Sequence, residues 1–110
     1  MRIFILSDHP LFGQGIESLI GQQTGLQTVG RASDIQQAMP QIQELRPDIV
    51  ILDSSNWPSG PAPVALPILA QQLGTKVIAL NLEDNSMSIY RGERRIVKEV
   101  KDLLEAIEDE

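Results

Sequence analysis

The chain has 110 residues, 42% of them hydrophobic and 22% charged, which are ordinary values for a globular protein and predict one folded domain over residues 1–110. Its formal charge of −6 argues against a nucleic-acid surface, and the absence of cysteine excludes disulfides and thiolate chemistry. The sequence shows neither a secretory leader nor an apolar segment long enough to cross a bilayer, so we expect a cytoplasmic protein with no membrane contact.

The first two predicted elements are a strand and a helix. Residues 2–7 form a short apolar run without alternation, which is typical of a strand buried on both faces. Asp8 or His9 can cap the helix that follows, with Pro10 in its first turn, where the missing N–H group has no cost. The inner face of this helix is expected to carry five apolar side chains, Leu11, Phe12, Ile16, Leu19 and Ile20.

A short edge strand over residues 26–30 comes next, followed by a second helix. Ser33 or Asp34 can cap that helix, whose apolar residues recur at helical spacing as far as Leu45. Pro40 lies inside the pattern and is expected to kink the helix or to split it in two, because proline removes a helical hydrogen bond.

The most informative stretch runs from residue 47 to residue 53. Its four consecutive apolar residues, 49–52, are typical of a central strand in a parallel sheet, and Asp53 follows at the carboxyl end of that strand. Ligands of open α/β sheets bind at this edge. Asp53 is therefore the first candidate functional residue, although an aspartate at this position can also simply accept hydrogen bonds from the next loop.

The pattern continues with a proline-rich third helix around residues 61–73 and a fourth strand at residues 76–80. This alternation predicts an α/β fold with a mostly parallel sheet, right-handed crossovers and helices on both faces. Residues 81–98 have no helical spacing, and an antiparallel β-hairpin with its turn at Gly92-Glu93 is expected there. The last helix is the clearest, with an apolar stripe of Val100, Leu103, Leu104 and Ile107.

Two paths are open for the hairpin. The chain can fold straight back beside the fourth strand and then meander through Gly92, or residues 94–98 can insert beside the fourth strand. Either path gives the sheet an antiparallel edge strand, with Arg91, Arg94 and Arg95 as its guard charges. We expect this edge, or the hairpin face that carries Tyr90, to bind a partner or to form a homodimer.

Three stretches of the chain resemble one family. Residues 8–12 (Asp-His-Pro-Leu-Phe), residues 46–53 (Arg-Pro-Asp-Ile-Val-Ile-Leu-Asp) and residues 103–107 (Leu-Leu-Glu-Ala-Ile) together resemble a response-regulator receiver domain, of the branch linked to helix-turn-helix output domains. The resemblance implies a flavodoxin-like fold and a role in bacterial two-component signalling and phosphorelay. It also implies a divergent, pseudo-receiver form, because a hairpin stands where the family has its fourth helix.

In that family an acidic pair after the first strand and an aspartate after the third strand bind Mg²⁺, and this aspartate accepts a phosphoryl group from a kinase. Cations must offset the phosphoryl charge. The resemblance assigns the acceptor position to Asp53 and the second acid of the pair to Asp8, whereas the first acid is replaced by the neutral Ser7. It assigns the switch hydroxyl position to Asn81 and the lysine after the fifth strand to Lys98.

These departures predict a stand-alone, receiver-like domain that is not an enzyme and acts by protein–protein interaction, with a histidine kinase or another signalling protein as partner. Phosphorylation and Mg²⁺ binding by Asp8 and Asp53 are expected to be weak or absent. Trp57 is expected either to anchor a partner or to cover the sheet edge. The first alternative is a working single-domain response regulator, phosphorylated on Asp53 with Mg²⁺. The second is a small flavodoxin-like binder of a nucleotide or flavin, for which the sequence shows no specific contacts.

Overall fold

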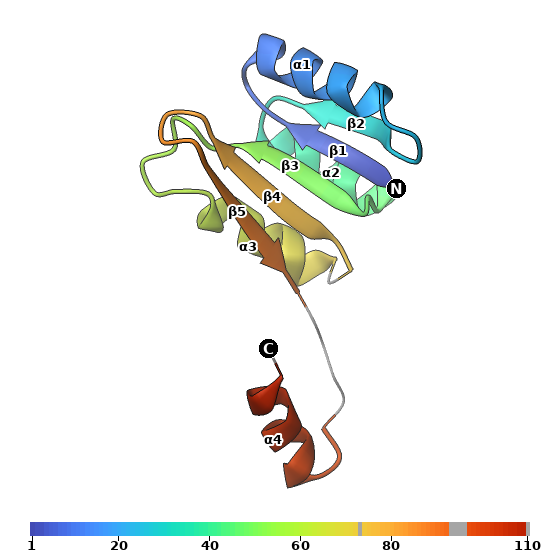
Figure 1. Ribbon diagram of the computed structural model, residues 1–110, viewed down its shortest axis with the longest axis vertical. Coiled ribbons are helices and arrows are strands. Elements are labelled where there is room, and N and C mark those ends of the chain that lie inside the picture. Colours follow the sequence, from blue (N-terminus) through green and yellow to red (C-terminus); the bar gives the residue numbers. More distant parts are fainter. Residues whose placement is uncertain (73, 93–96, 110) are drawn as a thin grey trace.

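Nine helices and strands follow one another along the part of the chain that the computed structural model describes, which is residues 1–72, 74–92 and 97–109 (Figure 1). The elements are β1 (Arg2–Leu6), α1 (Pro10–Gly21), β2 (Gln27–Ala32), α2 (Ile35–Leu45), β3 (Ile49–Asp53), α3 (Ala62–Gln71), β4 (Lys76–Asn81), β5 (Ser86–Arg91) and α4 (Val100–Glu108). The predicted α/β class is confirmed.

The strands form one sheet in the order β2-β1-β3-β4-β5. The first four run parallel, and β5 pairs antiparallel with β4. The predicted flavodoxin-like, mostly parallel sheet is therefore confirmed. Because β1 has β2 on one side and β3 on the other, the chain reverses its direction of winding at β1, and the loops after β1 and β3 meet at the carboxyl edge.

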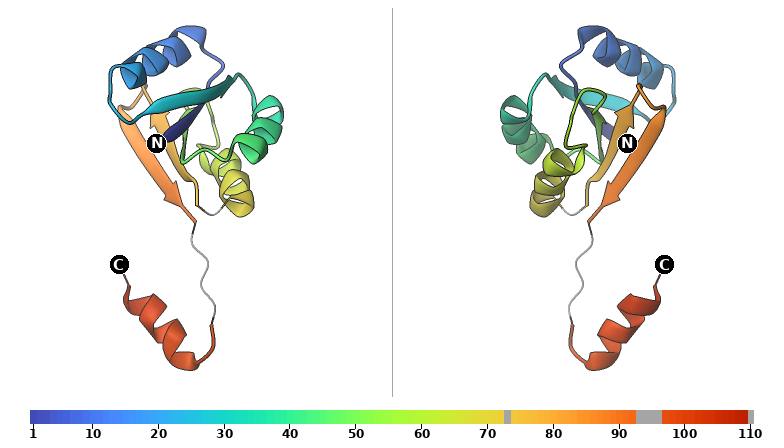
Figure 2. Two further views of the ribbon diagram at one scale, coloured as in Figure 1. Left: turned by 90° about the vertical axis from the view of Figure 1, so that its right-hand side faces the viewer. Right: turned by 90° about the vertical axis from the view of Figure 1, so that its left-hand side faces the viewer.

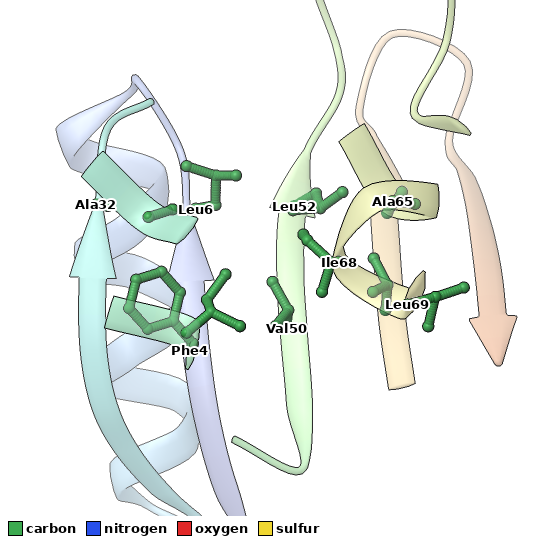
Figure 3. Close-up of a cluster of buried hydrophobic side chains, with 12 residues drawn as sticks. Phe4, Leu6, Ala32, Val50, Leu52, Ala65, Ile68 and Leu69 are labelled. Carbon is green, nitrogen blue, oxygen red and sulfur yellow. The ribbon is translucent and has the colours of Figure 1, made fainter. Parts of the chain in front are cut away.

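The two faces of the sheet are covered unequally. Helices α2 and α3 lie on one face and α1 lies on the other (Figure 2). The larger core lies under α2 and α3 and includes Phe4, Leu6, Val50 and Leu52, all almost fully buried (Figure 3). Each such side chain contributes roughly 1.5–3 kcal/mol by leaving water. The smaller core, under α1, is formed by Ile3, Ile5 and Ile20.

The capping residue predicted from the sequence is confirmed for α2, whereas the side chain of the N-cap residue of α1 makes no capping hydrogen bond. Asp34 caps α2 by accepting a hydrogen bond from the backbone N–H of Gln37 at 2.8 Å, as predicted. α2 is a single helix despite Pro40 inside it, so the alternative of two separate helices is wrong. His9 is the N-cap residue of α1, but its side chain caps nothing and points instead to a residue of β3.

The predicted inner face of α1 is partly wrong. Ile20 is buried and Ile16 packs beside it, as expected. Leu11 and Leu19, however, are 83% and 56% exposed. The physical reason is that α1 packs mainly over β1 and β2 and has no neighbouring helix on its face within the described residues, so only a narrow stripe of its surface contacts the sheet.

The hairpin joins β4 to β5 directly. Leu80 faces Met87 and Asn81 faces Ser86, and Asn85 takes a positive φ of 57° in the intervening turn. The path in which the chain folds straight back is therefore confirmed. Insertion of residues 94–98 beside β4 is wrong, because β5 already occupies that edge. Glu93 of the predicted Gly92-Glu93 turn, together with Arg94 and Arg95, lies outside the described part of the chain.

The last predicted helix is confirmed as α4. It begins with a capping box in which Glu99 and Asp102 each accept a hydrogen bond from the other's backbone N–H group. None of its residues is buried, and Figure 1 shows it apart from the sheet. Among the described residues, no helix is both long and apolar enough to span a bilayer.

Candidate functional site

The candidate site lies at the carboxyl edge of the sheet, between β1 and β3. Leu6 pairs with Leu52 across these two parallel strands, so the residues that follow them, Ser7 and Asp53, come out side by side. His9 follows two residues after Ser7, at the start of α1. Strand register therefore joins residues that are 44 positions apart in the chain.

Asp53 is almost completely buried, with 4% of its surface exposed, and both carboxylate oxygens accept hydrogen bonds. Oδ1 accepts from the Oγ of Ser55 at 2.7 Å and from the N–H of the same residue at 3.2 Å. Oδ2 lies 2.9 Å from Nδ1 of His9 and accepts more weakly from the hydroxyl of Ser7 at 3.4 Å. Burial acts to raise the pKa of Asp53, but the hydrogen bonds from Ser55 and His9 outweigh it and leave that pKa below the usual value of 3.8.

His9 lies between two carboxylates. Its Nδ1 is 2.9 Å from Oδ2 of Asp53 and 3.2 Å from Oδ1 of Asp8, while half of its side chain, 49%, is exposed. The hydrogen bond to Asp53 and then the charge of Asp8 raise its pKa above 6.5, against a smaller effect of desolvation. The two carboxylates thus favour the imidazolium form of His9, whose positive charge would offset theirs.

Three groups at this edge could bind a cation. One ligand atom each from Asp8, His9 and Asp53 lies within 4.8 Å of the others. Mg²⁺ prefers oxygen ligands and keeps several waters, so the two carboxylates fit it, whereas the His9 ring does not. Nδ1 of His9 contacts both carboxylates, and hence Mg²⁺ could enter only after this ring turns away. Ser7 adds a neutral hydroxyl where the resemblance implies a third charge.

Asn81 ends β4 at the same edge, but its side chain is committed to the hairpin turn. Its Oδ1 accepts hydrogen bonds from the backbone N–H of Glu83 at 2.9 Å and of Asp84 at 3.4 Å. This is the geometry of an Asx turn, which stabilises the reversal between β4 and β5. Asn81, at the position that the resemblance assigns to the switch hydroxyl, therefore makes hydrogen bonds that stabilise the turn.

Ser55 is a site residue that sequence reasoning missed. Its hydroxyl donates to Asp53 and accepts a hydrogen bond from the N–H of Leu82 at 3.0 Å, so it links the acceptor position to the hairpin turn. The local signal was present, because a serine two residues after an aspartate is suited to a short turn. Its link to residue 82 depends on the pairing of β3 with β4 and is not local.

The remaining predicted residues are not gathered at the site. Lys98 lies beside α4, where its backbone N–H donates to Asp102. Trp57 is half-buried against the larger core, and it lines a pocket of about 300 Å³ together with Asp8. Tyr90 is half-buried on the α3 face of the sheet, and Arg91 is exposed at the far end of β5.

Curated sequences similar to this chain include response regulators. No family model matches the chain. The response regulator GacA of Pseudomonas viridiflava is 28% identical over 82 residues, which are 74% of this chain and 38% of GacA. The probable transcriptional regulatory protein NarL of Mycobacterium tuberculosis is 28% identical over 91 residues, 83% of this chain and 42% of NarL. The chain thus spans about two-fifths of the length of these relatives.

Solved structures agree with the sequences. The signal receiver domain of the NarL protein from Mycobacterium tuberculosis has 30% identity and a TM-score of 0.63, covering 73% of this chain and 64% of that one. The response regulator domain of Thermotoga maritima CheB has 25% identity and a TM-score of 0.61, covering 74% and 60%. A LuxR-family regulator from Aurantimonas, 22% identical, shares the fold with a TM-score of 0.65 and covers 97% and 66%. By sequence and by fold, this chain is similar to the receiver domains of bacterial response regulators.

Proposed function

We propose that this receiver-like domain acts by binding a protein partner, with phosphorylation of Asp53 weak or absent. The observation that carries the proposal is the contact of 2.9 Å between Nδ1 of His9 and Oδ2 of Asp53. A carboxylate can accept a phosphoryl group only if one oxygen is free to attack, and both oxygens here are held by Ser55 and His9. Asp53, which stands at the position of the family's phosphoacceptor, thus forms an ion pair with His9 of the same chain instead.

The charges around Asp53 support the same proposal. Phosphoryl transfer depends on cations that neutralise the equatorial oxygens of the transferred group. When bound, Mg²⁺ supplies that positive charge, and Asp8 and Asp53 would hold it here. With Ser7 neutral and His9 already between the two carboxylates, the attraction for a divalent ion is reduced. Lys98 lies beside α4 rather than at this edge.

The partner is expected to be a protein rather than a small molecule, and we propose no enzymatic activity. The edge of β5 is exposed, and six residues of backbone lie along it from Ser86 to Arg91. Exposed strand edges pair readily with another chain. We therefore place association along this edge, with Tyr90 and Arg91 in it and Arg94 and Arg95 next in the sequence, and with a histidine kinase, another signalling protein or a second copy as partner.

Beryllofluoride with Mg²⁺ tests the proposal, because this complex mimics a phosphoryl group on aspartate. Fluorescence of Trp57, the single tryptophan of the chain, reports on the loop after β3. We expect no saturable change in the parent and none in Asp53→Asn. A saturable change in the parent that Asp53→Asn abolishes would instead establish the alternative, a working single-domain response regulator phosphorylated on Asp53.

The parent and Asp53→Asn should also capture the same protein from a cell lysate, identified by mass spectrometry. Loss of that protein in the variant, with the circular dichroism spectrum unchanged, would contradict the proposal. The other alternative, a nucleotide or flavin binder, predicts an absorbing cofactor that copurifies with the chain. Purified protein with the absorption of Trp and Tyr alone would argue against a flavin.

A further inference from the structure

One apolar area of the sheet has no helix over it in the part of the chain that the structure describes. Side chains alternate between the two faces of the sheet along each strand. Val77 and Ala79 of β4 point toward α2 and α3, so Ile78 and Leu80 and their neighbours on β3 and β5 point toward the other face. α1 packs over β1 and β2, so the other half of its face, on β3, β4 and β5, is uncovered by any described helix. We call this area the bare face; it consists of Ile78, Leu80, Met87 and Ile89 together with Ile49 and Ile51, which also pack against the smaller core under α1.

The exposure of the bare face is greatest at its outer strand. Met87 and Ile89 of β5 are 58% and 49% exposed, and their neighbours on β3 and β4 are half-buried. Three adjacent strands thus contribute apolar side chains to one continuous surface. Soluble proteins rarely leave such a surface in water unless another element binds it.

Helix α4 carries a matching stripe. Val100, Leu103, Leu104 and Ile107 repeat at helical spacing, and each is between 53% and 75% exposed. A helix with one apolar side and no buried residue is stable only when that side packs against something. The chain therefore presents two apolar surfaces, one on a sheet and one on a helix, that are complementary in kind.

Charge adds to this complementarity. Lys76 of β4 pairs with Arg91 of β5, so both cations stand on the bare face at the amino end of the parallel strands. Residues 99–109, which include α4, carry five acids and one lysine. An acidic helix laid over a surface that ends in two cations gains from this pairing, and the gain also disfavours other apolar occupants.

We propose that the bare face is covered by α4 of a second copy of this chain, and that two copies exchange their α4 helices reciprocally. The inference deepens the proposed function, since it names the occupant of the β5 edge. Closure of α4 on its own sheet would cover the bare face but leave the edge of β5 exposed. A two-fold pair covers two bare faces and both strand edges at once.

The direction of β5 fits this arrangement. Because β5 runs antiparallel to β4, the chain leaves its own sheet beside Lys76, at the edge opposite Asp53. In a two-fold pair with β5 against β5, the partner's β5 ends beside Ser86 instead, at the carboxyl edge. From there the partner's α4 can run back over the bare face, as helices that follow parallel strands do. Eight residues, 92–99, connect β5 to α4 and span at most about 29 Å.

Sedimentation of matched variants tests the exchange. We expect the parent to be a dimer at micromolar concentration. Leu103→Ala with Leu104→Ala should raise its dissociation constant at least about tenfold, as loss of a buried anchor does. The control is Lys101→Ala with Glu105→Ala on the polar side of α4, which keeps helix propensity and should leave the dimer unchanged. A monomeric parent, or equal dissociation constants for the two double variants, would overturn the proposal while leaving the His9–Asp53 argument intact.

Cross-linking separates exchange from closure on the same chain. The chain has no cysteine, so Ile89→Cys and Leu103→Cys can be introduced singly, and the two variants mixed, unfolded, refolded together and treated with a short thiol cross-linker. Exchange predicts a cross-linked species of twice the chain mass. If the mixture yields none, and a chain with both cysteines is cross-linked only within itself, α4 closes on its own sheet and the proposal fails.

Discussion

Nδ1 of His9 lies 2.9 Å from Oδ2 of Asp53, so the residue that begins α1 holds the carboxylate that ends β3. In receiver domains the aspartate at this strand end is the acceptor of a phosphoryl group. In this chain the same carboxylate is buried, takes hydrogen bonds from Ser55 and faces a cation supplied by the protein itself. Because of this contact, we expect stability and Mg²⁺ binding to depend on the protonation of His9 and Asp53 and on the charge of the residues around them.

The pair should be visible in a proton titration. The chain has one histidine, so a single imidazole signal in the NMR spectrum reports on it, and its midpoint is expected above 6.5. Asp53→Asn should lower this midpoint, because it removes the largest cause of the shift. Asp8→Asn should lower it less. A midpoint at or below 6.5 in the parent, unchanged by Asp53→Asn, would show that the contact is absent in solution.

The same shifts predict how stability depends on pH. The pKa of His9 is raised, so its contribution is complete below pH 6.5 and is lost as pH rises through the folded-state value. The pKa of Asp53 is lowered, so its contribution is present above pH 3.8 and is lost as pH falls through its folded-state value. The difference in melting temperature between the parent and His9→Gln should therefore be greatest between these limits. A difference that grows above pH 8 would contradict the ion pair.

Magnesium binding is predicted to be weak, with a dissociation constant in the millimolar range or weaker. Ser7→Asp restores a carboxylate beside Asp8 and should strengthen binding by roughly tenfold or more, because affinity at oxygen sites rises with ligand charge. Ser7→Asn is the matched control, since it changes size without adding charge. Titration followed by Trp57 fluorescence measures all three proteins. Micromolar binding by the parent would contradict the proposed function.

Asn81 is predicted to act as a turn residue. Asn81→Ala leaves the N–H of Glu83 without its acceptor and should cost about 0.5–1.5 kcal/mol of unfolding free energy. Asn81→Asp keeps an oxygen at Oδ1 and should retain most of that stability. Chemical denaturation measures both variants. If alanine leaves stability unchanged but alters the response to beryllofluoride, this residue serves as a switch rather than as a turn cap.

The sheet could be predicted from the sequence because each buried parallel strand is a run of consecutive apolar residues. The unbroken apolar runs of β1 and β3 identify both strands, and the motif residues place Asp53 at the edge where ligands bind. The cap of α2 by Asp34 is equally local, since donor and acceptor are three residues apart. The antiparallel β5 also followed from the lack of helical spacing after Asn81.

The contacts that define the site could not be predicted in the same way. The approach of His9 to Asp53 depends on the register of β1 against β3, which brings together residues 44 positions apart. The exposure of Leu11 and Leu19 depends on which helices lie beside α1, and no local pattern records a missing neighbour. The same missing neighbour creates the bare face.

Gly30 of β2 is predicted to tolerate no larger side chain. A Cβ atom at this position would lie 2.8 Å from Cε2 of Phe4 and 3.1 Å from Cδ1 of Leu45. Phe4 is fully buried, so its ring has no space into which it can move. Gly30→Ala should therefore cost about 1–3 kcal/mol of unfolding free energy, the usual penalty of overpacking.

Gly15 provides the matched control for this substitution. It lies in α1, and a Cβ atom there would meet nothing within 4 Å. Gly15→Ala should raise stability by about 0.5–1 kcal/mol, because alanine loses less backbone entropy in a helix. Adding Phe4→Leu to Gly30→Ala should recover part of the loss, since the smaller side chain vacates the space that the new methyl group needs. If Gly30→Ala is as stable as the parent in chemical denaturation, β2 does not pack against β1 and α2 as closely as these distances require.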